Sequence, residues 1–108
     1  QGIYIGDDVM VARGTYMHAA NHRIDDLERP ISEQGYECKI VEHEGREYSI
    51  VIEDGVWIGS NVVVVSGTKL GRGSVVSAGS VVSGNIPAFS IVVGNPAKRV
   101  MSREKNNR

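Results

Sequence analysis

Aliphatic residues recur with a period of six through the C-terminal half of the chain. Stepping by six gives an unbroken aliphatic series, namely Ile52, Ile58, Val64, Leu70, Val76 and Val82. Four residues after each member lies a second series of small or branched residues, namely Val56, Val62, Thr68, Ser74, Ser80 and Ile86. An amphipathic helix repeats every 3.6 residues, and ordinary antiparallel strands would be longer than such short units. The pattern therefore predicts short strands stacked in parallel coils.

The residue directly before each member of the second series is of a type that favours a turn of the backbone. These residues are Gly55, Asn61, Gly67, Gly73, Gly79 and Asn85, and such residue types accept a positive φ. The same phase appears near the start of the chain, with Ile5, Val11 and Met17 in the first series and with Asp8 and Gly14 at the corners. Each six-residue unit is thus expected to be one strand and one corner, and both stretches are expected to belong to one array.

The repeat is interrupted between residues 18 and 51, and this segment holds all three histidines and 8 of the 13 acidic residues. Because solenoid proteins place insertions on their binding side, we expect a long loop with a functional role. Residues 36–48 are consistent with a small hairpin inside it. We therefore expect a single β-helix domain over residues 1–108, divided into a first coil segment (1–17), an extended loop (18–51), hexapeptide coils (52–87) and a closing segment with a tail (88–108). The chain begins at Gln1 within the pattern, so we expect it to be the C-terminal part of a longer protein.

Composition agrees with an all-β domain and restricts its partners. The chain has 108 residues, enough for one core, and its 16 Val and 10 Ile far outnumber 2 Leu and 6 Ala. A net charge of -1 argues against nucleic acid as a partner, and no apolar run approaches the roughly 20 residues of a membrane span. The single cysteine, Cys38, cannot form an internal disulfide, which favours a cytoplasmic location.

The six consecutive units resemble the hexapeptide repeat of the left-handed parallel β-helix, which is found chiefly in acyltransferases that use acetyl-CoA. This resemblance implies an all-β triangular prism with three hexapeptides per turn and one long inserted loop. The left-handed sense comes from the resemblance alone, because periodicity does not reveal handedness and crossovers are usually right-handed.

A second resemblance concerns the catalytic region. The segment Ala20–Asp25, followed later by Val56–Ser60, resembles the catalytic region of the xenobiotic, galactoside and polysaccharide O-acetyltransferases. In that family a histidine at the root of the loop is the general base, and the match falls on His22. Independently of the family, an imidazole titrates near neutral pH and can take a proton from an attacking hydroxyl. The neighbours expected to bind the acceptor are Asn21, Arg23 and Asp25.

The resemblance also implies a binding site for acetyl-CoA. By this resemblance Trp57 is an outward aromatic beside the transferred group, and Ser60 lies at the thiol end of the cofactor. Ala78 and Gly79 are the small residues along the pantetheine, and Lys98 and Arg99 are the basic pair at the phosphates. Many relatives carry a lysine and an acid just before the Ile-Pro pair. This chain has Gly84-Asn85 there, so one phosphate contact is expected to be missing.

The expected function is transfer of an acetyl group from acetyl-CoA to a hydroxyl of a saccharide or related small acceptor, without a metal. The family implies a homotrimer with sites between adjacent prisms, which the outward apolar residues Val63, Val65, Val75 and Val81 support. N-acetylation of an amino nucleotide sugar and acetylation of an antibiotic stay open within this class. Two alternative functions of other classes also stay open, namely a zinc hydratase similar to the γ-type carbonic anhydrases and a non-catalytic trimeric module. His18 and His43 are expected to be structural or to lie on the acceptor side, and His43 has the charged neighbours of a surface residue.

Overall fold

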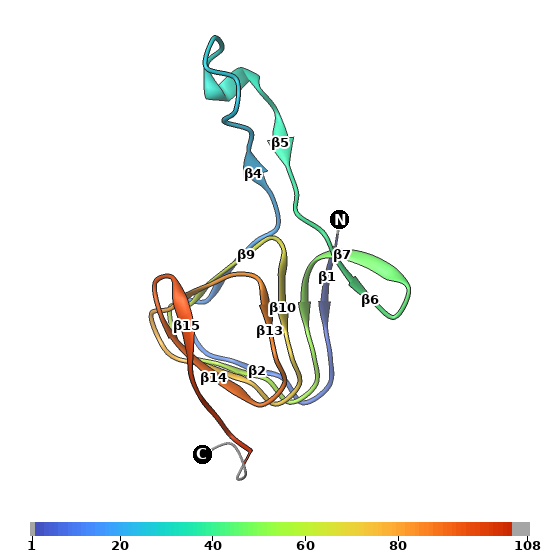
Figure 1. Ribbon diagram of the computed structural model, residues 1–108, viewed down its shortest axis with the longest axis vertical. Coiled ribbons are helices and arrows are strands. Elements are labelled where there is room, and N and C mark those ends of the chain that lie inside the picture. The colour runs from blue at the N-terminus through green and yellow to red at the C-terminus, as the bar shows by residue number, and fades with distance from the viewer. Residues whose placement is uncertain (1, 105–108) are drawn as a thin grey trace.

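Short strands wind about a common axis to form a triangular prism in the computed structural model, which describes residues 2–104 (Figure 1). The first face contains β1 (Gly2–Ile5), β7 (Arg46–Ile52), β10 (Thr68–Leu70) and β13 (Asn85–Ile86). The second face contains β2 (Met10–Val11), β8 (Trp57–Ile58), β11 (Val75–Val76), β14 (Ser90–Gly94) and β15 (Ala97–Ser102). The third face contains β3 (Tyr16–His18), β9 (Val63–Val65) and β12 (Val81–Val82).

Parallel pairing between successive coils confirms the six-residue pattern. Ile52 lies beside Leu70, Ile58 beside Val76 and Val64 beside Val82, so equivalent residues are three hexapeptides apart. The first coil has the same phase, because its aliphatic residues pair with the first series of the next coil. The pairs are Ile5 with Ile52, Val11 with Ile58 and Met17 with Val64. All six members of the first series are buried inside the prism. Burial of these aliphatic side chains is the main favourable contribution to folding.

The predicted corners adopt a positive φ, with one exception at the last coil. Asp8 and Asn61 have φ of 58°, and the predicted glycine corners lie between 69° and 84°. At the end of the repeat the corner is Gly84, with φ of 85°, whereas Asn85 lies in β13. Ile86 pairs with Leu70, so it takes the place of a first-series residue. The predictions for Asn85 and Ile86 are therefore wrong, because this coil is two residues shorter than those before it.

The inserted segment forms two structures (Figure 1). Residues 19–40, here called the arm, rise away from the prism and contain β4 (Asn21–His22), the 3-10 helix Ile31–Glu33 and β5 (Tyr36–Glu37), which pairs antiparallel with β4. A hairpin follows, in which β6 (Val41–His43) pairs with the start of β7. The expected hairpin thus exists, but it begins at Val41, because Tyr36 belongs to the arm.

Strand β7 returns to the prism earlier than the pattern suggests. Residues 49–52 are completely buried, and β7 pairs with both β1 and β10. The segment from Ser49 to Val51 is therefore part of the coil and not of the loop. Two aliphatic residues directly before Ile52 extend the strand, and the six-residue series alone does not reveal them.

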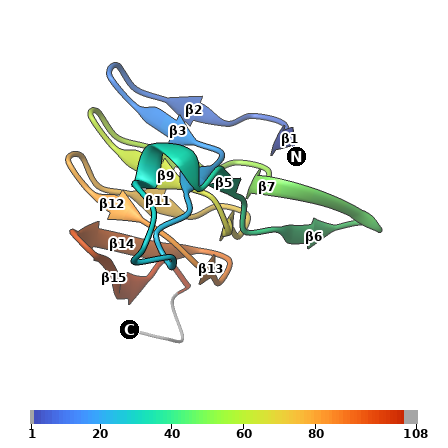
Figure 2. The ribbon, with the colours of Figure 1, turned by 90° about the horizontal axis from the view of Figure 1, so that it is seen from above.

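The coils stack from β1 at one end to β14 at the other (Figure 2). At the second end β15 folds back antiparallel onto β14. Within residues 2–104 the helical structure is limited to the short 3-10 turn of the arm, and no helix there has the length and apolar character to cross a membrane.

Candidate functional site

A groove of about 390 Å³ follows the corner between the second and third faces. Each residue that lines it comes from β2, β8 or β11 or directly follows one of these strands, so three successive coils contribute to it. The lining residues are Ala12, Trp57, Gly59, Ser60, Val75, Val76, Ser77 and Ala78. Three positions expected to bind acetyl-CoA, namely Trp57, Ser60 and Ala78, therefore lie together in one groove.

The backbones of adjacent coils approach closely at this groove. A Cβ atom added to Gly59 would lie 2.7 Å from the amide nitrogen of Ala78 and 3.1 Å from the carbonyl oxygen of Val76. Real Cβ atoms do not tolerate such contacts with backbone, so glycine is required there. Half of the lining consists of small side chains, namely Ala12, Ser60, Ser77 and Ala78, which leave backbone groups accessible beside the larger Trp57.

Trp57 belongs to an apolar row that crosses the outer surface of the second face. Register places Met10, Trp57, Val75, Ile91 and Met101 side by side on five neighbouring strands. Trp57 is 51% exposed, and the two methionines at the ends are more than half exposed. The expectation that Trp57 points outward is confirmed. An exposed apolar row of this length is typical of a surface that contacts a ligand or another protein.

The other expected cofactor residues lie outside the groove. Gly79 is an exposed corner with φ of 77°, next to Ala78 but not in the lining. Lys98 and Arg99 are exposed on β15, which is separated from β11 by β14. Lys98 lies opposite Val93, a residue of β14 that is 42% exposed. The basic pair thus belongs to the same face as Trp57, two strands away from Val75.

His22 lies on the arm and is exposed. It lies directly opposite Tyr36 in the ribbon formed by β4 and β5, and the two ring centroids are 4.8 Å apart with a 30° angle between the planes. The arm leaves the prism at the corner between the third and first faces, whereas the groove follows the corner between the second and third (Figure 1). A single chain therefore does not bring His22 and the groove together.

The expected acceptor residues lie beside His22 on the arm. Arg23 Nη2 lies 3.1 Å from Asp25 Oδ2, and both side chains are exposed. The hydrogen bond from Arg23 lowers the pKa of the Asp25 carboxyl below its ordinary value. A cavity of about 260 Å³ is lined by Arg23, Asp25, Asp26, Arg29 and Gln34. Asn21 is exposed opposite Glu37 and is not among the residues that line it.

Gln34 fixes the tip of the arm, and the sequence pattern gave no indication of this role. Its side-chain oxygen accepts a hydrogen bond of 3.1 Å from the Asp26 amide. Its amide group donates to the carbonyl oxygens of Asp26 and Arg29, at 2.7 and 2.8 Å. These contacts join a side chain to backbone across a loop, so no periodicity or motif reports them.

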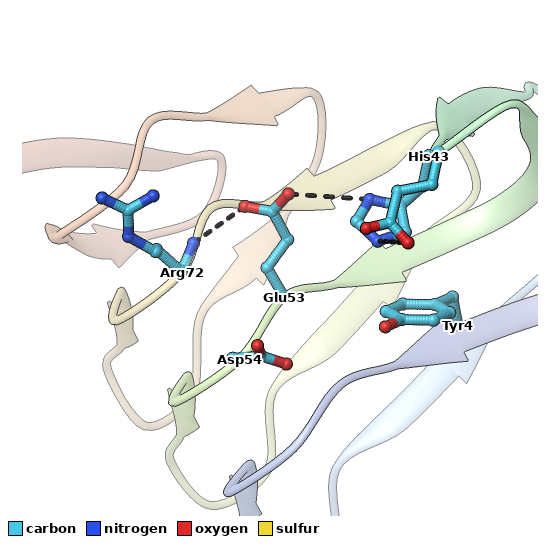
Figure 3. Close-up of a pocket in the computed structure, with 6 residues that line it drawn as sticks. Tyr4, His43, Glu53, Asp54 and Arg72 are labelled. Atoms are coloured by element: carbon cyan, nitrogen blue, oxygen red, sulfur yellow. Dashed lines mark hydrogen bonds and ion pairs between the residues drawn. The ribbon is translucent and has the colours of Figure 1, made fainter.

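A third surface cavity, of about 180 Å³, lies beside the first face and is lined by residues that include Tyr4, His43 and Glu53 (Figure 3). His43 Nδ1 lies 3.6 Å from Glu53 Oε2, and its Nε2 lies 3.9 Å from Glu44. The side chain is only 13% exposed, so the expectation of an ordinary surface residue is wrong. Tyr4 packs on this imidazole, and burial together with the negative charges of Glu44 and Asp54 raises the pKa of its phenol. No cluster of three or more side chains suited to a metal ion occurs among residues 2–104.

Comparison with known proteins agrees with the stacked six-residue coils of the prism. Residues 49–84 match the family described as bacterial transferase hexapeptide (six repeats). A protein of Mycobacterium tuberculosis described as a "Probable acetyltransferase" is 42% identical over 102 residues, which is 94% of this chain and 31% of that protein.

Two solved structures are also similar. One is a hexapeptide-repeat acetyltransferase of Vibrio cholerae in complex with acetyl coenzyme A, with a TM-score of 0.79, 38% identity, and coverage of 95% of this chain and 50% of that one. The other is a galactoside acetyltransferase in complex with coenzyme A, with a TM-score of 0.72, 28% identity, and coverage of 96% and 46%. The chain thus spans half or less of each of these proteins. It has the left-handed parallel β-helix fold and carries, over residues 49–84, the hexapeptide repeat of bacterial transferases, as do the acetyltransferases that it resembles.

Proposed function

We propose that the protein transfers an acetyl group from acetyl-CoA to a hydroxyl of a saccharide or related small acceptor in the cytoplasm. The observation that carries this proposal is the groove that brings Trp57, Ser60 and Ala78 together on a hexapeptide-repeat prism. The similarity to a Vibrio cholerae acetyltransferase solved with acetyl coenzyme A supports the choice of acyl donor.

The groove residues fit the pantetheine portion of coenzyme A. The absence of a side chain at Gly59 and the small side chains of Ser60 and Ala78 leave backbone groups of the groove within reach of amides in a ligand. Trp57 at one side of the groove supplies an apolar wall for the acetyl end, and Ser60 lies near it as a polar group. Lys98 and Arg99 on the same face supply positive charge for phosphates.

His22 is the general base of the proposed reaction. Its imidazole accepts the proton of the acceptor hydroxyl while that oxygen attacks the thioester carbonyl, and thiolate is the leaving group. Proton transfer of this kind contributes about 10²- to 10⁴-fold to the rate. Backbone amides near the groove stabilise the negative charge that develops on the carbonyl oxygen. Acetyl-CoA supplies the activated acetyl group, so no nucleophilic serine or cysteine is needed.

A homotrimer completes the site, because His22 and the groove belong to different corners of one prism. The third face lies between these corners and carries an outward row of Tyr16, Val63 and Val81. The arm also exposes apolar residues, including Leu27 at 93% and Ile24 at 64%. Association of copies about a threefold axis covers these surfaces and brings the arm of one copy to the groove of the next.

A polar acceptor agrees with the chemistry of the arm. The cavity beside His22 is lined by two arginines, two aspartates and a glutamine, which together offer donors and acceptors for several hydroxyl groups. The similar galactoside acetyltransferase is named for a saccharide acceptor.

Binding of coenzyme A tests the groove directly. At about 100 times its Kd, coenzyme A should raise the free energy of unfolding by about 2.7 kcal/mol. Substitution Ala78→Leu should remove this thermal shift by filling the groove, while Ser83→Leu, at an exposed position after β12, should preserve it. A shift that is equal in both variants would contradict the assignment of the groove.

A further inference from the structure

Each of the three histidines lies beside a tyrosine ring. Tyr4 is 4.4 Å from His43, Tyr16 is 4.8 Å from His18, and Tyr36 is 4.8 Å from His22, measured between ring centroids. The arrangement at His22 differs from that at His18, because the planes are tilted by only 30° in the first pair and by 72° in the second. Tyr36 thus presents much of the face of its ring to the His22 imidazole.

A base needs a fixed orientation, and a histidine usually obtains it from a hydrogen bond to its second ring nitrogen. Among residues 2–104 no hydrogen bond or ion pair to the His22 imidazole is formed, so the ring contact with Tyr36 is what restrains its plane. At His43, in contrast, both ring nitrogens face carboxylates.

The local fold holds the two rings in register. His22 and Tyr36 are directly opposed residues of an antiparallel pair, where side chains on one face lie close enough to contact. The Arg23 amide donates to the Gly35 carbonyl oxygen at 3.0 Å and continues the ladder beyond the pair. Gly35 has φ of 82° just before Tyr36, and Gln34 binds the backbone of the opposite segment. The ribbon is therefore closed on the side of the arm's tip.

We propose that Tyr36 is a positioning residue that sets the plane of the His22 imidazole for proton abstraction. This inference rests on the proposed role of His22. Tyr36 contacts the imidazole of the base, so its effect is on the step in which the proton moves. The ring carries the effect, because the contact is between ring faces and the hydroxyl contributes no hydrogen bond to the imidazole.

Steady-state kinetics of the full chain with acetyl-CoA and an active acceptor test this inference. Loss of orientation in Tyr36→Ala and Tyr36→Leu should lower kcat by about 10- to 100-fold, because a small misplacement of a reacting group has a cost of that order. The KM values for acetyl-CoA and for the acceptor should stay within about twofold, and Tyr36→Phe should keep most of the wild-type kcat. The matched control Tyr4→Leu removes the ring beside His43 and should leave kcat unchanged.

The double variant His22→Ala/Tyr36→Ala separates positioning from a general structural role. If Tyr36 acts through His22, the double variant should be no slower than His22→Ala alone. Further slowing would overturn the inference, as would an unchanged kcat in Tyr36→Ala, a loss in Tyr36→Phe as large as in Tyr36→Ala, or an effect confined to KM. Full activity of His22→Ala would instead refute the proposed function on which the inference depends.

Discussion

Glycine at the contacts between coils shows how single residues determine the spacing of this fold. Gly71 is buried, and an added Cβ atom would lie 2.5 Å from the Ala88 amide and 2.7 Å from the Ile86 carbonyl oxygen. Both atoms belong to the backbone of the next coil, so they cannot move aside without disturbing the strand pairing. Small residues at this position therefore allow the coils to stack.

Substitution Gly71→Ala should lower the free energy of unfolding by about 1 to 3 kcal/mol, the usual cost of overpacking. Denaturant unfolding measures this difference. Gly2→Ala is the matched control, since its new methyl group would make only an ordinary contact at 3.9 Å with Tyr48. Equal stability of the two variants would show that the coils have room to move apart.

The corner at Asn61 gives a second prediction for a single residue. Asn61 has φ of 58°, a conformation that costs an alanine roughly 1 to 2 kcal/mol and a glycine much less. Asn61→Ala should therefore lower the thermal midpoint of unfolding, and Asn61→Gly should stay near the wild type. A larger loss in the glycine variant would mean that the asparagine side chain, and not the φ angle, determines the choice of residue.

For single residues, the sequence predicts the features that repeat along the chain well and the isolated contacts poorly. The corners at Asp8 and Asn61 follow from the period, because each occupies a place where glycine stands in the other coils. The burial of His43 among carboxylates does not follow from it, since its partner Glu53 directly follows β7 and lies ten residues further along the chain. Contacts of this kind depend on three-dimensional placement that no local pattern encodes.

Among the elements, the arm is distinct from the strands that surround it. Its strands β4 and β5 pair with each other and not with the prism. Its root is joined to the prism through Cys38, whose Sγ lies 2.7 Å from Ser49 Oγ and 3.0 Å from the Ala19 carbonyl oxygen. The break in the repeat predicts that an insertion exists, but its internal pairing and the start of β7 depend on contacts that leave no periodic trace.

Replacement of residues 20–37 by a short Gly-Ser linker should leave the prism folded, because Ala19 and Cys38 are retained and the buried core contains no residue of the deleted segment. Acetyl transfer should be lost, since His22 is removed. Thermal unfolding with and without coenzyme A, together with a turnover assay, measures both effects. A variant that retained turnover, or one whose prism failed to fold, would contradict the division of roles between arm and prism.

For the whole molecule, the proposed trimer follows from the separation of His22 and the groove on one prism. Val63→Asp places a charge in the outward row of the third face and should dissociate the protein into monomers with loss of turnover. Asn85→Asp adds the same charge at an exposed position on the first face and should preserve assembly. Sedimentation velocity at micromolar concentration distinguishes these outcomes, and a wild-type protein that is already monomeric would contradict the proposed site.

Release of free thiol from acetyl-CoA in the presence of a panel of saccharides, nucleotide sugars and hydroxylated antibiotics tests the central claim most directly. The wild type and the control His43→Ala should turn over a saccharide hydroxyl, while His22→Ala should lose about 10²- to 10⁴-fold in kcat with its thermal shift by coenzyme A intact. Undiminished turnover by His22→Ala would contradict the account, because His22 is the only histidine of the arm and the proposed reaction has no other base there.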